Sequence, residues 1–416
     1  MKQVEYADVF SLFKKTFEKI NDNLIIHGNN VSFITLFMIN KLNRYLDDDI
    51  AKICLAALLH DIGAYKKDDL SKILDFELEE KLSYKHSIYG YIFIKNFSPI
   101  AKYAEAVLHH HTSLEKLNKL NLDDDTLEIT KIIHIADLAD LCINKMPNTD
   151  LMTFLRCQTA LDQNYVELLI DFDKDLILNQ NFFTSSLYQS LLKKRPFKQR
   201  DVDKILEMIA YSIDFISPHT VNHTIITKSI AYELGVYFNL PKDELNNLEQ
   251  AAIVHDIGKI AIPNDILESP NKLSTEEFEI MKQHVIYTEK ILSKIAKPEI
   301  VKIATRHHEK LNGTGYPKQL SAKDLTTSDR ILAIADIVSA LIGKRSYKDE
   351  FDKSRVISIL ESEINKNTID KEITEAFINN YDKFVEFATK KAHPFIEKYN
   401  QCYLNYRDVY ETLNNL

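Results

Sequence analysis

The chain has 416 residues, enough for two or three domains that each bury a hydrophobic core. It contains only 8 glycines and 10 prolines, against roughly 29 and 21 in an average chain of this length. Because glycine and proline form many turns, their scarcity favours long helices and argues against a fold built of β-hairpins. The net charge of −9 is unlike that of a protein that binds duplex nucleic acid, but it does not exclude a small anionic substrate held by a metal ion.

Two further features bear on cellular location. The four cysteines are scattered and form no Cys-x-x-Cys pair, which argues against a zinc knuckle or a disulfide framework and is typical of reduced thiols in a cytoplasmic protein. The N-terminal segment mixes charged and apolar side chains, unlike a signal peptide. No apolar run approaches the roughly 18 residues of a transmembrane helix. We therefore expect a cytoplasmic protein that does not enter a membrane.

The sequence contains an internal repeat. The tetrapeptide His-Asp-Ile-Gly follows an apolar helical run twice, at 60–63 and at 255–258. Other histidines and one aspartate recur around it at offsets of 195 to 199 residues, a spacing too constant for chance. The pattern predicts an all-α protein made of two copies of one helical domain. The matched pairs are His27 with His223, His60 with His255, His86 with His284, His109 and His110 with His307 and His308, and Asp137 with Asp336.

The second copy gathers histidine and aspartate side chains but no cysteine. Imidazole and carboxylate ligands suit Fe, Mn, Zn or Ni and argue against a thiolate structural site. Since His255 and Asp256 are adjacent at a helix end, the histidine can bind one metal ion while the carboxylate bridges to a second. A lone histidine would more often be a core or capping residue, but an ordered set that occurs twice argues against that interpretation. Six or seven protein ligands exceed what one tetrahedral ion needs, which favours two metal ions. The other candidate ligands in this copy are His284, His307, His308 and Asp336.

The motifs of the second copy resemble those of the HD-GYP family, metal-dependent phosphodiesterases that open cyclic dinucleotides. The resemblance spans about residues 206–350 and is carried by HDIGK at 255–259, by His284, and by HHEKLNGTGYP at 307–317. It implies two HD-type helical bundles, a degenerate one at 1–197 and a phosphodiesterase domain at 198–416, divided near the Lys-Lys-Arg-Pro run at 193–196. The metal ligands that it implies are His223, His255, Asp256 as the bridge, His284, His307, His308 and Asp336.

The resemblance also implies substrate contacts. Lys259 matches a lysine beside the scissile phosphate, where a cation offsets charge that grows on the phosphoryl oxygens. Arg345 and Lys348 match cationic positions that hold substrate phosphates. The signature loop, which we call the GYP loop, is expected to shape the substrate mouth or to form a surface for a signalling-protein partner. Its residues are Gly313, Gly315, Tyr316 and Pro317.

Several positions depart from the family pattern. Asn312 stands where the family often has Asp, Ser339 replaces a second Asp, and Ser346 replaces a Pro. His219 lies one helical turn before His223, where members with three metal ions carry Glu. His219 can therefore either reach a third metal ion or form a hydrogen bond to a ligand. The expected cofactors are two or three divalent metal ions, with Fe or Mn expected first and Ni as a further candidate.

The first copy keeps candidate metal ligands without the substrate cations. Ala64 stands where the second copy has Lys259, no GYP loop follows the histidine pair, and no arginine matches Arg345. This copy is therefore expected to bind metal without hydrolysing the same substrate, or to keep its histidines as hydrogen-bonded relics. Its candidate ligands are His27, His60, Asp61, His86, His109, His110 and Asp137.

The predicted function is a metal-dependent phosphodiesterase that hydrolyses cyclic di-GMP or 3′,3′-cyclic GMP-AMP to a linear dinucleotide. One alternative is an HD-type phosphohydrolase that acts on mononucleotides, against which the GYP loop argues. Another is a non-catalytic receptor for a cyclic dinucleotide, against which Lys259 and the full ligand set argue. The expected partner is the cyclic dinucleotide, not duplex nucleic acid or a membrane, and the sequence predicts neither the substrate bases nor the oligomeric state.

Overall fold

The computed structural model describes residues 5–17, 22–65, 80–191, 198–216, 218–267, 269, 271–343 and 351–414. These residues are largely helical and contain no β-strand, which confirms the all-α prediction. The chain forms two compact units: an N-terminal unit of Lys2–Lys204 with Gln401–Leu416, and a C-terminal unit that contains Ile205–Asn400. The division at 197/198 stays a prediction, and the run at 193–196 lies outside the described residues.

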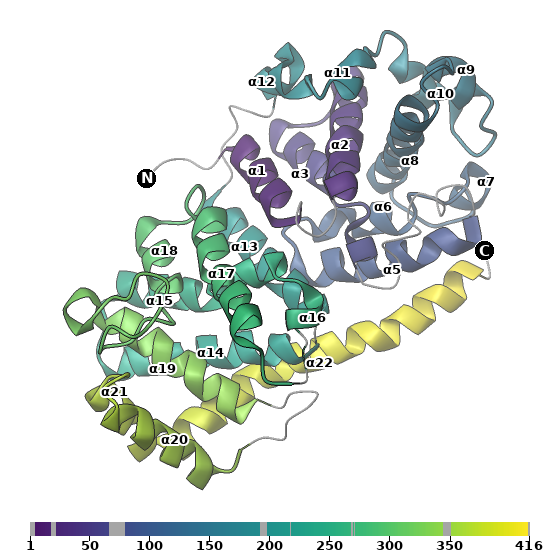
Figure 1. Cartoon of the computed structure of the whole chain (residues 1–416). Helices are drawn as coiled ribbons and strands as arrows, with labels where there is room; N and C mark the ends of the chain where they lie inside the picture. The colour runs from purple at the N-terminus through teal and green to yellow at the C-terminus, as the bar shows by residue number, and fades with distance from the viewer. Residues whose placement is uncertain are drawn as a thin grey trace. The chain divides into compact units, whose positions relative to one another are not determined.

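The described part of the N-terminal unit consists of long helices and of short helical turns (Figure 1). They are α1 (Tyr6–Phe17), α2 (Asp22–Leu42), α3 (Asp47–Leu58), η1 (Ile62–Tyr65), α5 (Glu80–Phe97), η2 (Ala101–Tyr103), α6 (Ala104–Leu108), α7 (Leu114–Leu117), α8 (Asp124–Lys145), α9 (Leu151–Arg156), α10 (Gln163–Val166), η3 (Glu167–Leu169), α11 (Asp175–Leu178), η4 (Phe182–Thr184) and α12 (Ser186–Leu191).

The rest of the described chain continues the same pattern. Two of these helices, α13 and α22, contain the points where the chain passes from one unit to the other. The elements are α13 (Gln199–Ile216), α14 (Pro218–Tyr237), α15 (Lys242–Val254), η5 (Ile257–Ala261), α16 (Asn264–Leu267), α17 (Thr275–Leu292), α18 (Pro298–Ala304), η6 (Ala322–Asp324), α19 (Thr327–Ile342), α20 (Lys353–Asn365), α21 (Lys371–Asn379) and α22 (Tyr381–Asn414).

The repeat is visible in how the helices pack. In the C-terminal unit α14 packs against α15 and α19, and α17 packs against η5. The N-terminal unit has the same arrangement: α2 packs against α3 and α8, and α5 against η1. Apolar side chains such as Ile230, Leu248 and Leu332 are fully buried in the C-terminal core, and each contributes about 1.5–3 kcal/mol. The two copies therefore hold their candidate ligands on equivalent helices.

The helices that carry candidate ligands begin at defined caps. Ser274 and Glu277 form a capping box at the start of α17, and Thr326 and Asp329 form another at the start of α19. In the N-terminal unit Asp123 accepts a hydrogen bond from the backbone of α8. Each cap satisfies backbone N–H groups that a helix start leaves unpaired. The caps fix the register of the helices that bear His284, Asp336 and Asp137.

The glycine of each His-Asp-Ile-Gly motif permits a close backbone approach. A Cβ on Gly258 would lie 1.9 Å from the carbonyl oxygen of His284, and one on Gly63 would lie 2.1 Å from that of His86. Only glycine fits where η5 meets α17, or where η1 meets α5. This contact brings the His-Asp pair of each copy next to the third histidine. No described helix is both long enough and apolar enough to span a bilayer.

Candidate metal centre

The C-terminal unit brings all seven predicted metal ligands together. They come from α14, from the turn between α15 and η5, from α17, from the segment after α18, and from α19. Within each of two groups, His223–His255–Asp256 and His284–His307–His308, the ligand atoms lie within 4.8 Å of one another. The seven are His223 on α14, His255 and Asp256 after α15, His284 on α17, His307 and His308 after α18, and Asp336 on α19.

Asp256 divides its two carboxylate oxygens between the two groups. Its Oδ2 lies 3.2 Å from His255 Nε2 and 3.6 Å from His223 Nε2. Its Oδ1 lies 3.4 Å from His284 Nε2 and 3.8 Å from His307 Nε2. A carboxylate in this position can bind one cation through each oxygen, as the bridge of a two-metal site does.

Asp336, on α19, faces the same two histidine groups. Its Oδ1 lies 3.1 Å from His223 Nε2 and 3.5 Å from His255 Nε2. Its Oδ2 lies 3.9 Å from His308 Nδ1. The centre therefore has two carboxylates among five imidazoles, a donor set of nitrogen and oxygen that suits the middle and later first-row divalent metals.

Backbone carbonyls hold three of the imidazole rings. In each case Nδ1 donates a hydrogen bond to the carbonyl three residues earlier, which leaves Nε2 facing the centre. The bonds run from His255 to Ala252 (2.8 Å), from His284 to Met281 (2.7 Å) and from His307 to Ala304 (2.7 Å).

His223 is held instead by a hydroxyl that sequence reasoning treated only as a departure from the family pattern. Ser339 Oγ lies 2.9 Å from His223 Nδ1 and donates to the carbonyl of Asp336, also at 2.9 Å. Thr227 Oγ1 lies 2.6 Å from the same hydroxyl. A hydroxyl that donates to a carbonyl is free to accept from His223 Nδ1, so Ser339 orients this ring. The repeated His-to-His spacing gave no signal for either hydroxyl.

Unpaired buried atoms show that the residues present fit a metal ion. His223 Nε2, His255 Nε2 and Asp256 Oδ1 are buried and have no hydrogen-bond partner among the described residues. Leaving such polar atoms unpaired away from water costs free energy that a bound cation would offset. These three atoms are therefore placed to bind a cation.

The pKa values of the ligands point the same way. Burial lowers the pKa of His284 and His307, and lowers that of His308 to about 3, so these rings are neutral. Burial raises the pKa of Asp256, but Lys259 and His255 outweigh it and hold that pKa well below its ordinary value. Burial alone would lower the pKa of His255, yet Asp256 raises it to about 10. The carboxylates therefore draw positive charge into the centre.

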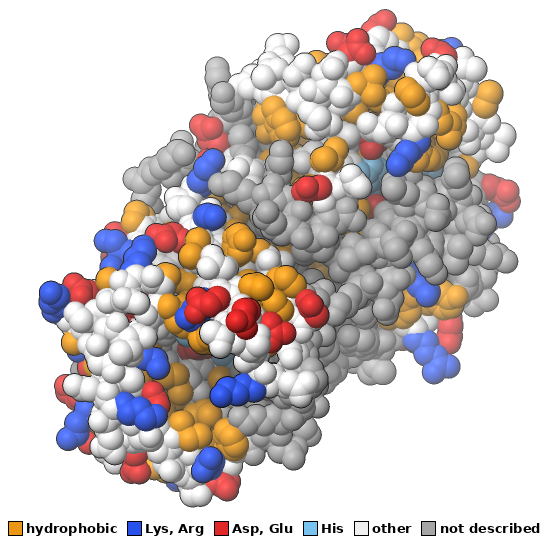
Figure 2. Space-filling view, in the orientation of Figure 1, with side chains coloured by type: hydrophobic (Ala, Val, Ile, Leu, Met, Phe, Trp, Pro, Cys, Tyr) orange, Lys and Arg blue, Asp and Glu red, His pale blue; other side chains and the backbone are white. Residues whose placement is uncertain are grey.

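Two predicted substrate groups border the ligands. Lys259 on η5 places Nζ 2.5 Å from Asp256 Oδ2. The Tyr316 ring of the GYP loop packs against His308, with their centroids 4.7 Å apart. Gly313 has a φ of +77°, and Gly315 is buried against the backbone of 308–310. Histidine side chains show only as small pale-blue patches on the face drawn in Figure 2, in keeping with their burial.

Glu309, between the histidine pair and the GYP loop, anchors that loop. Its carboxylate accepts hydrogen bonds from the backbone N–H groups of Lys318 (2.7 Å) and Leu320 (2.8 Å). Sequence reasoning quoted this glutamate in the motif but gave it no role. Its position next to two ligands was the available signal.

Glu309→Ala is expected to lower the free energy of unfolding by about 2–3 kcal/mol, since two N–H groups lose a charged acceptor. Thermal or urea unfolding measures this. Glu289→Ala is the control, because Glu289 forms only an exposed ion pair with Lys318 Nζ, and its loss should cost less than about 1 kcal/mol. Equal losses in the two variants would contradict the anchoring role.

Three predicted residues fall outside what the structure describes. Arg345 and Lys348 lie in the segment 344–350. His219 belongs to α14, but its side chain is not among those described. Their proposed roles, including a third metal ion, stay predictions.

The N-terminal unit brings together a corresponding set of histidines and aspartates, but its histidine pair is shifted by one residue from the predicted pair. Its ligand atoms also form two groups, one with His27, His60 and Asp137 and one with Asp61, His86, His110 and His111. His109, predicted as a ligand, contacts Thr112 and Glu105 and belongs to neither group. His110 and His111, not His109 and His110, therefore correspond in space to His307 and His308.

Comparisons with known proteins agree with this duplication. Family models described as HD domain match residues 31–144 and 205–373. The chain is 23% identical to 3′3′-cGAMP-specific phosphodiesterase 1 of Vibrio cholerae over 92% of this chain and 94% of that protein. It is 28% identical to 3′3′-cGAMP-specific phosphodiesterase 2 of the same organism, over 74% and 66% of the two chains.

Other relatives match mainly one half. A cyclic di-GMP phosphodiesterase of Thermotoga maritima is 32% identical over 42% of this chain and 48% of its own. The solved structure of a cyclic GMP-AMP specific phosphodiesterase of V. cholerae covers 91% of this chain and 96% of that chain, with a TM-score of 0.53 and 17% identity, which shows a shared fold. Together with the paired helices and ligand sets, these matches show that the chain belongs to the HD domain family and carries two HD domains in tandem.

Proposed function

We propose that the chain is a metal-dependent phosphodiesterase that opens a cyclic dinucleotide at its C-terminal HD domain. The observation that carries the proposal is the position of Asp256, with one oxygen toward each histidine group and Lys259 beside it. The names of the relatives, which are cyclic GMP-AMP and cyclic di-GMP phosphodiesterases, support the substrate class. The resemblance of the GYP loop supports the same class.

The residues of the centre have separable roles. When bound, two divalent ions supply an activated water and neutralise charge on the phosphate. Neutral imidazoles and two carboxylates would hold those ions, and the hydrogen bonds to Nδ1 keep the rings in place. Lys259 is placed to offset charge that develops on a phosphoryl oxygen. Tyr316 offers an aromatic face beside His308, against which a nucleobase can stack.

The finer assignments belong to the same proposal. We propose 3′,3′-cyclic GMP-AMP ahead of cyclic di-GMP, because two relatives that match parts of both halves of this chain bear the first substrate in their names. The proposed ions are Fe or Mn, with Ni as a further candidate, since the nitrogen and oxygen donor set suits each of them. The exposed residues within and beside the segment of the GYP loop, Asn312, Thr314, Lys318 and Gln319, form the proposed surface for a signalling-protein partner.

A substrate panel tests the function and the division of labour together. Anaerobically purified protein, loaded with Fe²⁺ or Mn²⁺, should convert a cyclic dinucleotide to the linear form, as followed by chromatography. Asp61→Ala in the N-terminal domain should keep this activity within about threefold, whereas His255→Ala should lose it. Both variants are first checked for folding by circular dichroism.

Three outcomes would contradict the proposal. Turnover of mononucleotides alone would favour the phosphohydrolase alternative. Tight binding of a cyclic dinucleotide without turnover at any metal loading would favour a receptor. A folded Asp61→Ala variant without turnover, beside an active His255→Ala variant, would reverse the roles of the two domains.

A further inference from the structure

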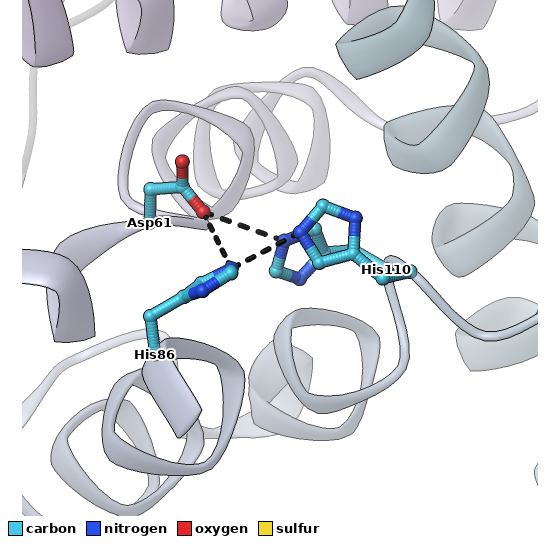
Figure 3. Close-up of side chains that lie close together, drawn as sticks. Asp61, His86 and His110 are labelled. Carbon is cyan, nitrogen blue, oxygen red and sulfur yellow. Dashed lines mark hydrogen bonds and ion pairs between the residues drawn. The ribbon is translucent and has the colours of Figure 1, made fainter. Parts of the chain in front are cut away.

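The N-terminal domain contains a bridging carboxylate of its own. Asp61 Oδ1 lies 3.1 Å from His86 Nε2 and 3.4 Å from His110 Nε2, and Figure 3 shows these three side chains pointing toward one another. Its Oδ2 faces the other way, 3.6 Å from His60 Nε2 and 3.8 Å from His27 Nε2. The two oxygens of Asp61 are thus divided between two histidine pairs.

A second carboxylate completes both groups. Asp137 Oδ1 lies 3.2 Å from His27 Nε2 and 3.8 Å from His60 Nε2, and its Oδ2 lies 3.6 Å from His111 Nδ1. The first possible metal position has four donors: the imidazoles of His27 and His60 and one oxygen from each of Asp61 and Asp137. The second has the imidazoles of His86, His110 and His111 together with Asp61 Oδ1. Four nitrogen and oxygen donors at each position are enough to hold a divalent ion.

Buried atoms in this cluster lack other partners. Asp61 Oδ1, His110 Nε2 and both carboxylate oxygens of Asp137 are buried and have no hydrogen-bond partner among the described residues. Asp61, His110 and Asp137 are each at least nine-tenths buried. A relic held by hydrogen bonds would pair these atoms with donors and acceptors. Their orientation toward one another instead suits a cation at the centre.

The residues behind the ligands are also in place. His60 Nδ1 donates to the carbonyl of Ala57 (2.8 Å), and His110 Nδ1 to that of Val107 (2.6 Å). Behind His27, Asp140 Oδ2 lies 2.7 Å from Nδ1, where the C-terminal domain uses Ser339. A carboxylate behind a ligand histidine fixes the ring and strengthens its other nitrogen as a donor.

The other oxygen of Asp140 is itself held. Asn30 and Asn144 donate to Asp140 Oδ1 at 2.7 Å and 2.6 Å. The N-terminal domain has therefore kept a complete support for His27 rather than an eroded one. The sequence comparison of the two copies did not bring out this network.

This cluster is more closed than the C-terminal one. The exposed fraction of the side chain is 7% for His111 against 27% for His308, 6% for Asp61 against 14% for Asp256, and 2% for Asp137 against 12% for Asp336. Ala64, fully buried, occupies the place of Lys259. Structural metal sites are closed, whereas catalytic ones keep an open position for water and substrate.

From this geometry we propose that the N-terminal HD domain binds a second pair of divalent metal ions, with Asp61 as the bridge and His110 and His111 as ligands, in a closed centre that stabilises the domain and does not hydrolyse the substrate. The proposal goes beyond the function proposed for the C-terminal domain and does not depend on its substrate.

The number of metal ions bound per chain tests the proposal directly. The full chain and its variants are stripped of metal, reloaded with Mn²⁺ without oxygen, desalted and analysed by mass spectrometry for Mn per chain. Wild type should hold about four ions and Asp61→Asn about two, with the C-terminal pair retained. His111→Gln should lose at least one ion. His109→Gln, the matched control from the same histidine run, should keep the wild-type number.

Thermal unfolding adds a readout that does not depend on activity. Asp256→Asn weakens the C-terminal centre, so the part of its Mn²⁺-induced rise in Tm that disappears when Asp61→Asn is added reports the N-terminal centre. We expect a clear rise for Asp256→Asn and a much smaller one for the double variant Asp61→Asn with Asp256→Asn. Wild type with only about two ions, unchanged in Asp61→Asn, would overturn the proposal, as would loss of metal in His109→Gln but not in His111→Gln. Both results stand whether or not the protein proves to be a phosphodiesterase.

Discussion

Asp256→Ala is expected to hold at least one metal ion fewer per chain than wild type and to lose hydrolysis of the cyclic dinucleotide by about 10⁴-fold or more. The reason is the place of the carboxylate between the two histidine groups, with its oxygens 3.2 Å from His255 Nε2 and 3.4 Å from His284 Nε2. Removing it takes one ligand from each ion and separates the pair. Metal analysis and turnover under saturating substrate measure the two effects.

A control variant distinguishes loss of the bridging carboxylate from the general effect of removing one negative charge. Asp243 lies in the first turn of α15, exposed and away from the ligand set. Asp243→Ala should therefore keep both metal content and turnover. If Asp256→Ala were fully loaded with metal and turned over at the wild-type rate, the two-metal interpretation of the C-terminal centre would be wrong.

Lys259→Ala is expected to keep its metal ions while kcat falls by about 10²–10³-fold, the scale of losing one group that stabilises charge in the transition state. Lys259 Nζ contacts Asp256 Oδ2, and a protonated ammonium group has no lone pair with which to bind a metal ion. Its removal should thus act on the chemical step more than on metal binding. Steady-state kinetics with parallel metal analysis distinguishes the two.

The matched control is a lysine on a neighbouring helix. Lys290 lies exposed in the last turn of α17, so Lys290→Ala should leave kcat within about twofold of wild type. A kcat of Lys259→Ala as high as that of Lys290→Ala would show that the ammonium has no part in the chemistry. Loss of metal in Lys259→Ala would show instead that the lysine supports the centre itself.

The helical class and the proximity of the C-terminal candidate ligands could be predicted from the sequence, because both depend on local patterns. His-Asp-Ile-Gly follows a helix both times it occurs, and this motif together with the His-His pair at 307–308 marks four of the seven candidate ligands of the C-terminal unit. Such motifs are read from adjacent residues, so their recognition does not require knowledge of the tertiary packing. The structure places Asp256 and Asp336 among those histidines.

What the sequence could not reach depends on tertiary packing. The first copy has three consecutive histidines, 109–111, and a constant offset selects the first two of them. The structure selects His110 and His111 instead. At the end of α6 the Nδ1 atom of His110 bonds to the carbonyl of Val107, as that of His307 bonds to the carbonyl of Ala304. Likewise, Ser339 and Asp140 contact the Nδ1 atoms of His223 and His27 from a different helix, and the sequence contains no periodic pattern that indicates these contacts. The grouping of 401–416 with the N-terminal unit is of the same kind.

The hydrogen bonds from ligand Nδ1 atoms to carbonyls three residues earlier bear on how such a protein can diverge. The acceptors are main-chain atoms, at Ala252, Met281 and Ala304 in one copy and at Ala57 and Val107 in the other. No side-chain replacement can delete them as long as the helix persists. A duplicated domain can therefore carry Ala64 where its counterpart has Lys259 and still keep the orientation of its histidines. The side chains that surround a metal centre can thus diverge while the main chain keeps the ligand rings in place.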